Sequence, residues 1–364
     1  MKREISNNKL QLDSLDGLRG LAALIVILSH TSNASMFFVP YFDARGVGKS
    51  GVFLFFLLSS FLLSRALIKQ NNIAFSMPAL SLYFQRRFFR IYPLYVPYLV
   101  LGLVSTYIFT TIFEKENLGF PFTLTLTELF NHLILIEGKG VTWSVAVEFK
   151  FYFCLPIIIY LIQLINAKFG VVWELVLLIT LVALTQIVSF QGDSVVNDSR
   201  LMPYMCIFLW GTILAVIQCE IEADKIKREN LELIVPLSYL SLLTLIVMTP
   251  EVTSLIFGYV ENSYYHKDFI QHAILWSVVL LSVVNFNSKL SSFFESNWLV
   301  FYGSLSFSIY LFHPIFIQLA KHFSMGTYVS AWFVLAGSTA SSYVSFKLLE
   351  LPASQFKFSF LSKR

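Results

Sequence analysis

The chain has few charged residues and few cysteines. Asp, Glu, Lys and Arg make up 13% of its 364 residues, about half the share found in soluble domains. This composition argues against a water-soluble globular protein. The three cysteines, Cys154, Cys206 and Cys219, are scattered along the chain. Their spacing fits neither a disulfide framework nor a metal site, and we expect no bound metal.

The sequence shows no pattern typical of a cleavable signal peptide, and we expect no soluble module. A polar stretch of about 17 residues precedes the first apolar run, and no small-residue cleavage site follows it. We therefore expect a retained membrane anchor. The net charge of +4 comes from basic residues at the ends of apolar runs, a topology signal, and we expect no nucleic-acid partner. The sequence predicts one membrane domain over 1–364, with its core at about 15–352 and no appended soluble domain.

Apolar runs dominate what is present. Hydrophobic residues make up 56% of the chain, and the runs are long enough to cross a bilayer as helices. We predict an all-α, polytopic membrane protein with about ten transmembrane helices. The predicted spans are 19–38, 51–69, 91–113, 142–166, 171–190, 201–217, 231–248, 269–286, 298–320 and 327–349.

The loop charges predict the orientation. With the N-terminus inside, 18 of the 26 basic residues fall on the inner side and 8 on the outer side. This bias favours both termini in the cytoplasm. Residues 76–90 place Pro78 near their start and arginines at their end. They predict a separate helix in the cytoplasmic membrane interface, before the third span.

Two ionisable residues stand out in the first span. Arg19 and His30 are eleven positions apart, so they share one helix face about 16 Å apart. His30 would lie near the bilayer midplane, where an ionisable group is a functional-site hypothesis. A neutral imidazole suits proton transfer, and Ser29 adds a third polar group. The alternative is a histidine that only bonds neighbouring helices.

A cluster of arginines precedes the third span. Arg86 and Arg90 share a helix face, and Arg87 points about 100° away. Guanidinium groups bind phosphates well, so the cluster suits a cytoplasmic, nucleotide-like anion. These side chains also fit a simple anchoring role at the membrane surface.

Further polar residues lie in the fourth, ninth and last spans. Ser144, Glu148 and Tyr152 form a stripe at i, i+4 and i+8, and a carboxylate within the membrane needs a partner. A structural ion pair or hydrogen bond is the alternative to a chemical role. His313 precedes Pro314, where a polar side chain can satisfy backbone groups that the proline frees. For Glu350 we expect a helix cap or an ion pair.

Five motifs in order give the chain a family resemblance. They are the Arg19–His30 pair, "GVFLFFLLSSFL" from Gly51, "RRFFRIYP" from Arg86, "WSVAVEFKFY" from Trp143 and "SFSIYLFHP" ending at Pro314. The chain resembles the acyltransferase 3 family of integral-membrane acyltransferases from about 15 to 352. It departs at Phe53, where an acidic residue is common, and at Ser60, where glycine is usual. The first departure weakens any catalytic role for a carboxylate beside the second span.

The resemblance implies O-acylation of an extracytoplasmic glycan, such as lipopolysaccharide O-antigen or another surface polysaccharide. Acetyl-CoA, or another acyl-CoA, would be a co-substrate rather than a permanently bound cofactor. The acceptor would be a glycan or lipid-linked glycan, and the protein would lie in a bacterial inner membrane. The residues expected at the site are His30, Glu148 and Arg19 for catalysis, Arg86, Arg87 and Arg90 for the donor, and Trp143, Ser144, Tyr152 and His313 for the substrate.

The mechanism expected from these residues is direct transfer, with neutral His30 as general base on the acceptor hydroxyl. Arg19 would hold donor phosphate or orient the site, and Glu148 would hold an imidazole tautomer or a substrate hydroxyl. A covalent acyl-enzyme on histidine or serine remains open. So do two other functions: a transporter or flippase for lipid-linked glycans or small metabolites, and acyl transfer to a lipid or an exported small molecule. The sequence does not define the oligomeric state.

Overall fold

The computed structural model describes residues 2–70, 75–114, 119–189, 197–258 and 269–355. Within these ranges all regular secondary structure is helical, which confirms the predicted all-α class. The chain divides into two compact units. The first unit comprises 1–71, 158–196 and 202–307, and the second comprises 72–157, 197–201 and 308–364.

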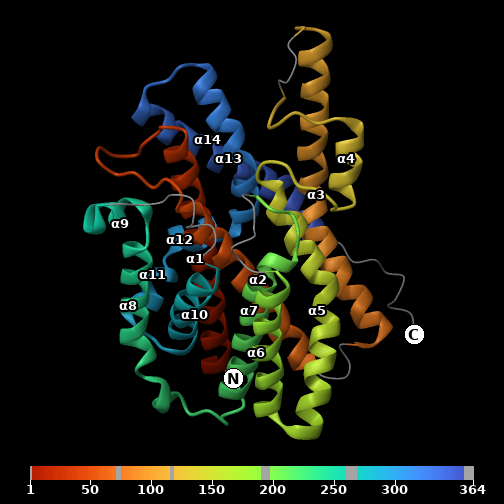
Figure 1. Cartoon of the computed structure of the whole chain (residues 1–364), viewed down its shortest axis with the longest axis vertical. Coiled ribbons are helices and arrows are strands. Elements are labelled where there is room, and N and C mark those ends of the chain that lie inside the picture. Colours follow the sequence, from red (N-terminus) through yellow and green to blue (C-terminus); the bar gives the residue numbers. More distant parts are fainter. Residues whose placement is uncertain (1, 71–74, 115–118, 190–196, 259–268, 356–364) are drawn as a thin grey trace. The chain divides into compact units, whose positions relative to one another are not determined.

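The first unit is a helical bundle. It contains α1 (Lys2–Asn33), α2 (Gly48–Gln70), the C-terminal part of α5 (Thr142–Phe169), α6 (Val171–Val188), α7 (Met205–Glu222), α8 (Ile234–Val247), α9 (Pro250–Phe257), α10 (Phe269–Asn285), α11 (Lys289–Phe294) and α12 (Asn297–Ser304). Its four largest interfaces pair α2 with α7, α1 with α12, α1 with α2 and α8 with α10. The side-by-side course of α8 and α10 is visible in Figure 1.

The second unit carries the arginine-rich segment. It contains α3 (Met77–Thr111), α4 (Leu126–Leu133), the N-terminal part of α5, most of α13 (Ser306–His322), α14 (Thr327–Ser345), a π-helical turn η6 (Phe346–Glu350) and α15 (Leu351–Gln355). The short helix α4 lies against α3. Both η6 and α15 also contact α3, so the end of the described chain packs on the helix that holds the arginines.

Among the described residues, six helical segments are long and apolar enough to cross a membrane. They are α2, α3, α5, α6, Met202–Glu222 and Arg228–Val247. The pair of α12 and α13 makes a seventh if the two count as one span, and α10 is a shorter apolar helix. The chain therefore carries the helices of a multi-pass membrane protein. The count of ten spans and the cytoplasmic termini stay predictions.

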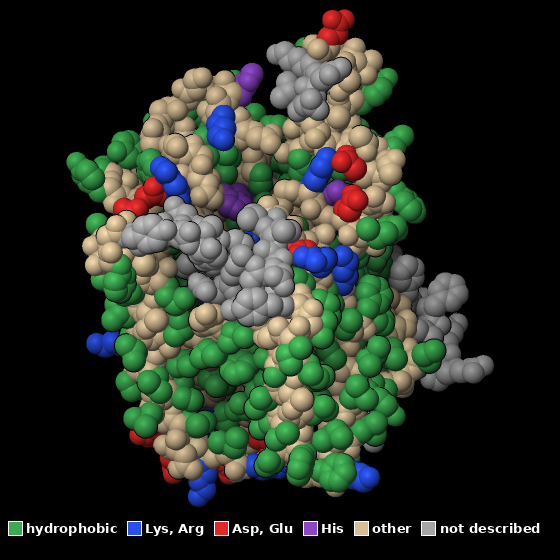
Figure 2. Space-filling view, in the orientation of Figure 1, with side chains coloured by type: hydrophobic (Ala, Val, Ile, Leu, Met, Phe, Trp, Pro, Cys, Tyr) green, Lys and Arg blue, Asp and Glu red, His purple; other side chains and the backbone are tan. Residues whose placement is uncertain are grey.

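The outward surfaces of these helices are apolar. The window of α6 has a mean hydropathy of 2.3, yet only 22% of it is buried inside the protein. Exposed side chains on this helix include Val172, Ile179 and Ile187. Figure 2 shows hydrophobic side chains covering the lower part of α5 and α6, with charged side chains at the lower edge. A surface of this kind is stable against lipid and unfavourable in water.

Three predicted boundaries were wrong. Residues 76–90 do not form a separate interfacial helix, because α3 runs unbroken from Met77 to Thr111. Ser76 caps its N-terminus by accepting from the Ala79 amide, and proline occupies the first turn. The helix containing the first span is α1, which starts well before 19 and ends at Asn33. The ninth span is two helices, α12 and α13, which bend by 77° around Leu305.

Glycines allow α1 to approach α11 and α12 at backbone distance. A Cβ atom at Gly17 would lie 1.8 Å from the Phe294 carbonyl oxygen, and one at Gly303 would lie 1.9 Å from the Asp16 carbonyl oxygen. A methyl group cannot fit at either position unless the helices separate. These close contacts fix α1, which carries Arg19 and His30, against its neighbours.

Buried hydroxyl groups join α2 to α7. The Thr212 hydroxyl lies 3.1 Å from the Ser60 hydroxyl and 2.9 Å from the Ser64 hydroxyl, and all three residues are buried. Ser60 also donates to the Phe208 carbonyl oxygen. Small residues and hydroxyl pairs are the usual means of packing helices in a membrane. Ser60, which replaces the glycine usual in the family, therefore takes part in the helix interface.

Candidate functional site

Arg19 and His30 lie on one continuous helix, as predicted. Because α1 is unbroken over Lys2–Asn33, the eleven-position spacing keeps its expected rise of about 16 Å. The Arg19 guanidinium donates to Asp16 Oδ1 at 2.9 Å, and the arginine side chain is 26% exposed. Arg19 is thus oriented by an ion pair within its own helix.

His30 lies where α1 meets the start of α2. A Cβ atom at Gly48 would lie 3.1 Å from Ser29 Oγ and 3.8 Å from His30 Cδ2. The absence of a Cβ at Gly48 therefore lets the start of α2 approach Ser29 and His30 closely. The ring is half-buried, Ser29 is 1% exposed, and the Lys49 ammonium lies within electrostatic range of the ring. The first unit therefore holds a histidine next to a hydroxyl group and a cation.

The arginines of α3 divide between two environments. Arg86 and Arg90 are exposed, whereas Arg87 is half-buried. The Arg87 guanidinium carbon lies 5.9 Å from the centre of the Tyr152 ring, which is within the range of a cation–π contact. Arg87 Nε is buried and has no hydrogen-bond partner among the described residues. It is a donor that an anionic ligand could satisfy.

Arg90 faces the end of the described chain. It interacts electrostatically with Glu350, a residue of η6 that is 8% exposed. The Glu350 carboxyl also forms a hydrogen bond with the side chain of Ser308 in α13. The Glu350 carboxyl thus lies within electrostatic range of a cation of α3 and next to a hydroxyl group of α13.

The polar stripe of α5 is hydrogen-bonded within the second unit. The Tyr152 hydroxyl donates to Glu148 Oε1 at 2.5 Å, as the i, i+4 spacing allows. The Tyr83 hydroxyl donates to the Tyr152 carbonyl oxygen at 3.1 Å. The Ser144 hydroxyl bonds instead to the Tyr310 hydroxyl at 2.8 Å. The half-buried Glu148 carboxylate, predicted to need a partner, has one in Tyr152.

Trp143 and His313 are deeply buried. Trp143 is 3% exposed, and its backbone lies so close to Gly138 that a Cβ there would be 2.3 Å from the Trp143 Cα. His313 is fully buried, and its Nδ1 lies 3.1 Å from the Ile309 carbonyl oxygen one turn earlier. Its ring centre is 6.0 Å from that of Tyr310. Trp143 shares α5 with the polar stripe, and His313 lies next to Tyr310, the partner of Ser144.

A folded loop follows α3 on the predicted outer side. Fully buried His132 bonds at both ring nitrogens: Nδ1 lies 2.7 Å from the Glu128 carbonyl oxygen, and Nε2 accepts from the Lys139 amide at 2.8 Å. These bonds require the neutral ring with its proton on Nδ1. Burial lowers the pKa of His132. The Lys139 ammonium, which bonds Glu128 Oε1 at 2.6 Å, lowers the pKa of Glu128.

Sequence reasoning missed four members of these clusters: Asp16, Lys49, Tyr83 and Tyr310. Two had a local signal. Asp16 stands three positions before Arg19, and Tyr83 stands four positions before Arg87, so each pair shares a helix face. Lys49 and Tyr310 had no such signal, because their contacts with α1 and α5 depend on the tertiary fold.

The fold and these clusters define a helical, multi-pass membrane protein with polar residues inside its spanning segments. The sequence model of the acyltransferase domain family called acyltransferase 3 matches residues 12–349. The chain belongs to this family, which confirms the resemblance found in its motifs.

Several curated proteins are similar to the chain. A Staphylococcus aureus (strain COL) protein named "Putative O-acetyltransferase" is 26% identical over 326 residues, covering 83% of this chain and 50% of the relative. The peptidoglycan O-acetyltransferase OatA of Listeria monocytogenes is 23% identical over 379 residues, covering 97% of this chain and 57% of the relative. The acyltransferase MdmB of Streptomyces mycarofaciens is 27% identical over 164 residues, covering 40% of this chain and 39% of the relative. The chain spans about half the length of the first two relatives. No solved structure matches it.

Proposed function

We propose that the chain is a membrane O-acetyltransferase that transfers an acetyl group from acetyl-CoA to a hydroxyl of an extracytoplasmic glycan. Membership of the acyltransferase 3 family supports acyl transfer. The names of the Staphylococcus and Listeria relatives support an O-acetyl product, and the Listeria name supports a glycan acceptor. The observation that carries the proposal is His30, an imidazole on the unbroken helix α1 with Ser29 and the start of α2 packed close beside it.

The donor is held in this proposal by the arginines of α3. Acyl-CoA carries phosphates, and arginine binds them through paired N–H groups. Exposed Arg86 and Arg90 meet the ligand from solvent, while the Nε of Arg87 offers a buried donor without a protein partner. The three side chains thus offer both exposed and buried contacts to one polyanion, more than membrane anchoring alone requires.

The chemical step is proton removal by His30. Neutral imidazole takes the proton of the acceptor hydroxyl, the oxygen attacks the thioester carbonyl carbon, and the carbon–sulfur bond breaks. The products are an ester on the acceptor and free CoA, whose sulfur receives the proton. Arg19, which forms an ion pair with Asp16, holds donor phosphate or orients the site.

The polar stripe of the second unit serves the acceptor in this proposal. Glu148 accepts from Tyr152, and Ser144 bonds to Tyr310. A carboxylate held in this way can also accept from a sugar hydroxyl, since an ionised carboxylate has several acceptor sites. Buried His313 and Trp143 support the helices that carry these groups.

The test is a chemical comparison of bacterial surface glycans with and without the expressed gene. We expect new O-acetyl signals in the NMR spectrum of the polysaccharide, and we expect alkali to remove them. Membranes containing the protein should release free CoA from acetyl-CoA when the acceptor is present. Transport of a glycan without a new ester and without CoA release would contradict the proposal and favour a flippase.

The donor site has its own test. The double substitution Arg86→Ala, Arg90→Ala should raise the acetyl-CoA concentration needed for half-maximal transfer about tenfold or more, since charged hydrogen bonds contribute about 1.5–3 kcal/mol each. The control is Arg228→Ala, which removes another exposed arginine, at the start of the short 3-10 helix η4 (Arg228–Leu231) before α8. An unchanged requirement in the double variant would assign these arginines to anchoring.

A further inference from the structure

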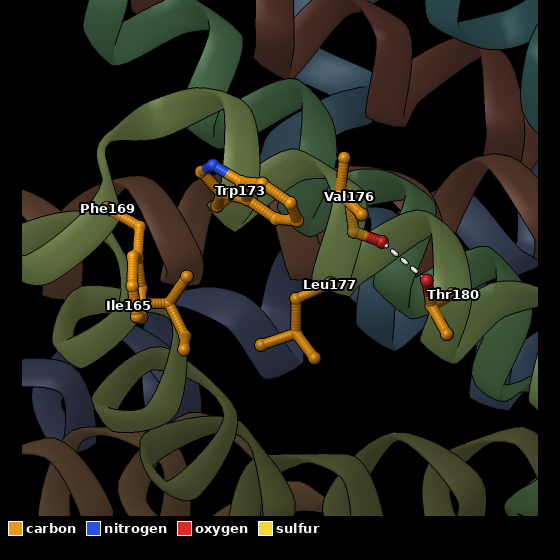
Figure 3. A pocket seen from close by; sticks show the side chains of 6 residues that line it. All are labelled: Ile165, Phe169, Trp173, Val176, Leu177 and Thr180. Carbon is orange, nitrogen blue, oxygen red and sulfur yellow. Dashed lines mark hydrogen bonds between the residues drawn. The ribbon is translucent and has the colours of Figure 1, made fainter.

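An apolar groove opens on the first unit at the turn between α5 and α6. Its volume is about 390 Å³, and its lining side chains are Ile165, Phe169, Trp173, Val176, Leu177 and Thr180. Figure 3 shows Ile165 and Phe169 on one side and Leu177 and Thr180 on the other, with the Trp173 ring above the space between them.

The helical spacing explains this lining. Residues 173, 176, 177 and 180 fall on one face of α6, and residues 165 and 169 fall on one face of α5. The two helices are joined by Gly170, whose φ of 89° reverses the chain in a single residue. The Thr180 hydroxyl donates to the Val176 carbonyl oxygen at 2.8 Å, so the groove presents hydrocarbon almost throughout.

The rim of the groove is positively charged. Lys168 lies in the last turn of α5, and its ammonium is 5.0 Å from the centre of the Phe169 ring. Trp173 is 58% exposed next to this turn. An exposed tryptophan and a lysine at the end of an apolar helix are typical of the membrane–water boundary. The nearby side chain of Glu174 is 1% exposed.

We propose that this groove binds one acyl chain of an anionic phospholipid, with the lipid phosphate beside Lys168. The volume equals that of roughly a dozen water molecules at about 30 Å³ each, a size that suits part of a single hydrocarbon chain. Negative headgroups complement the rim charge, and the predicted orientation puts this turn on the cytoplasmic side, where anionic lipids attract basic residues.

A second copy of the chain is a poorer occupant. A stable protein interface buries about 1,200–2,000 Å² in total, far more than six side chains of one hairpin provide. The groove is narrow and continuous with the apolar, outward surface of α6. A single lipid chain extends from such a groove into the bilayer without burying polar groups.

The test is native mass spectrometry of the full-length purified protein titrated with phosphatidylglycerol or phosphatidylcholine. Val176→Phe fills the groove and should lower the bound fraction of tightly held phosphatidylglycerol about tenfold. Val172→Phe is the control, because Val172 lies one turn away on the same helix, is 67% exposed and does not line the groove. It should leave the bound fraction unchanged.

The rim lysine has a separate signature. Lys168→Gln should reduce the preference for phosphatidylglycerol over phosphatidylcholine about fivefold, the effect of one interfacial cation, while chain binding persists. Equal lipid retention by the two phenylalanine variants would overturn the proposal. A dimer that dissociates only in Val176→Phe would assign the groove to a second copy instead. Lipid binding is measured without acyl transfer, so its outcome is independent of the proposed function.

Discussion

Substituting Gly17 with alanine should separate α1 from the neighbouring helix α11. A Cβ at this position would lie 1.8 Å from the Phe294 carbonyl oxygen. Reaching a contact of about 3.0 Å requires a shift of roughly 1.2 Å between two backbones (3.0 less 1.8), which no side-chain rotation can supply. Overpacking of this kind costs about 1–3 kcal/mol. Alanine recovers about 1 kcal/mol of helix propensity, so we expect a net loss of about 2 kcal/mol at most.

The assay is thermal unfolding of the purified protein in lipid nanodiscs, followed by acetyl transfer at a temperature where the variant stays folded. Misplacing a catalytic group by about 1 Å can reduce a rate about 100-fold, so transfer should fall at least tenfold. The control is Gly102→Ala, another buried glycine inside a helix, whose Cβ would lie 3.4 Å from its nearest neighbour. Equal stability and activity in Gly17→Ala would refute the close helix contact.

Three further predictions concern single side chains. Burial lowers the pKa of His132 in the folded protein, so on acidification the unfolded chain takes up this proton before the folded protein does. The free energy of unfolding should therefore fall as the pH drops below about 6.5. Hydrogen exchange of α4 measures this fall, and His132→Gln should remove the pH dependence. Tyr152→Phe should lower acetyl transfer about tenfold with the folded yield unchanged, because Glu148 loses its hydrogen-bond donor. The control is Tyr160→Phe, at an exposed tyrosine of the same helix. Equal transfer rates in both variants would exclude this hydrogen bond from the site. Thr212→Val should lower the free energy of unfolding by about 1 kcal/mol, since it breaks two buried hydroxyl contacts between α2 and α7. An unchanged midpoint of thermal unfolding would contradict a stabilising role for these contacts.

Hydrophobic periodicity predicted several helices closely. The predicted spans at 51–69 and 269–286 agree with α2 and α10 within a few residues, because these runs are apolar and bounded by polar loops. The same reasoning failed for 76–90. Paired arginines there suggested an interfacial segment, but the aromatic residues between them continue the helical pattern into α3. Charge indicated the membrane boundary and did not indicate a break in the helix.

The candidate site was predictable only where its contacts are local. The bond between Glu148 and Tyr152 follows from their spacing on one helix. Ser144 belongs to the same stripe, yet its partner is Tyr310, 166 positions later, and no pattern in one sequence relates the two. The break at Leu305 had a weak signal in the glycine and serines around it, but their apolar neighbours concealed it.

The central claim is that His30 accepts the proton of the acceptor hydroxyl. The most direct measurement compares O-acetyl esters on surface glycan from cells that express His30→Gln or His322→Gln at equal membrane levels. His322 is exposed at the end of α13 and serves as the matched control. The account predicts loss of the ester signal in His30→Gln alone. Full esterification in that variant would remove the imidazole from the reaction and contradict the mechanism.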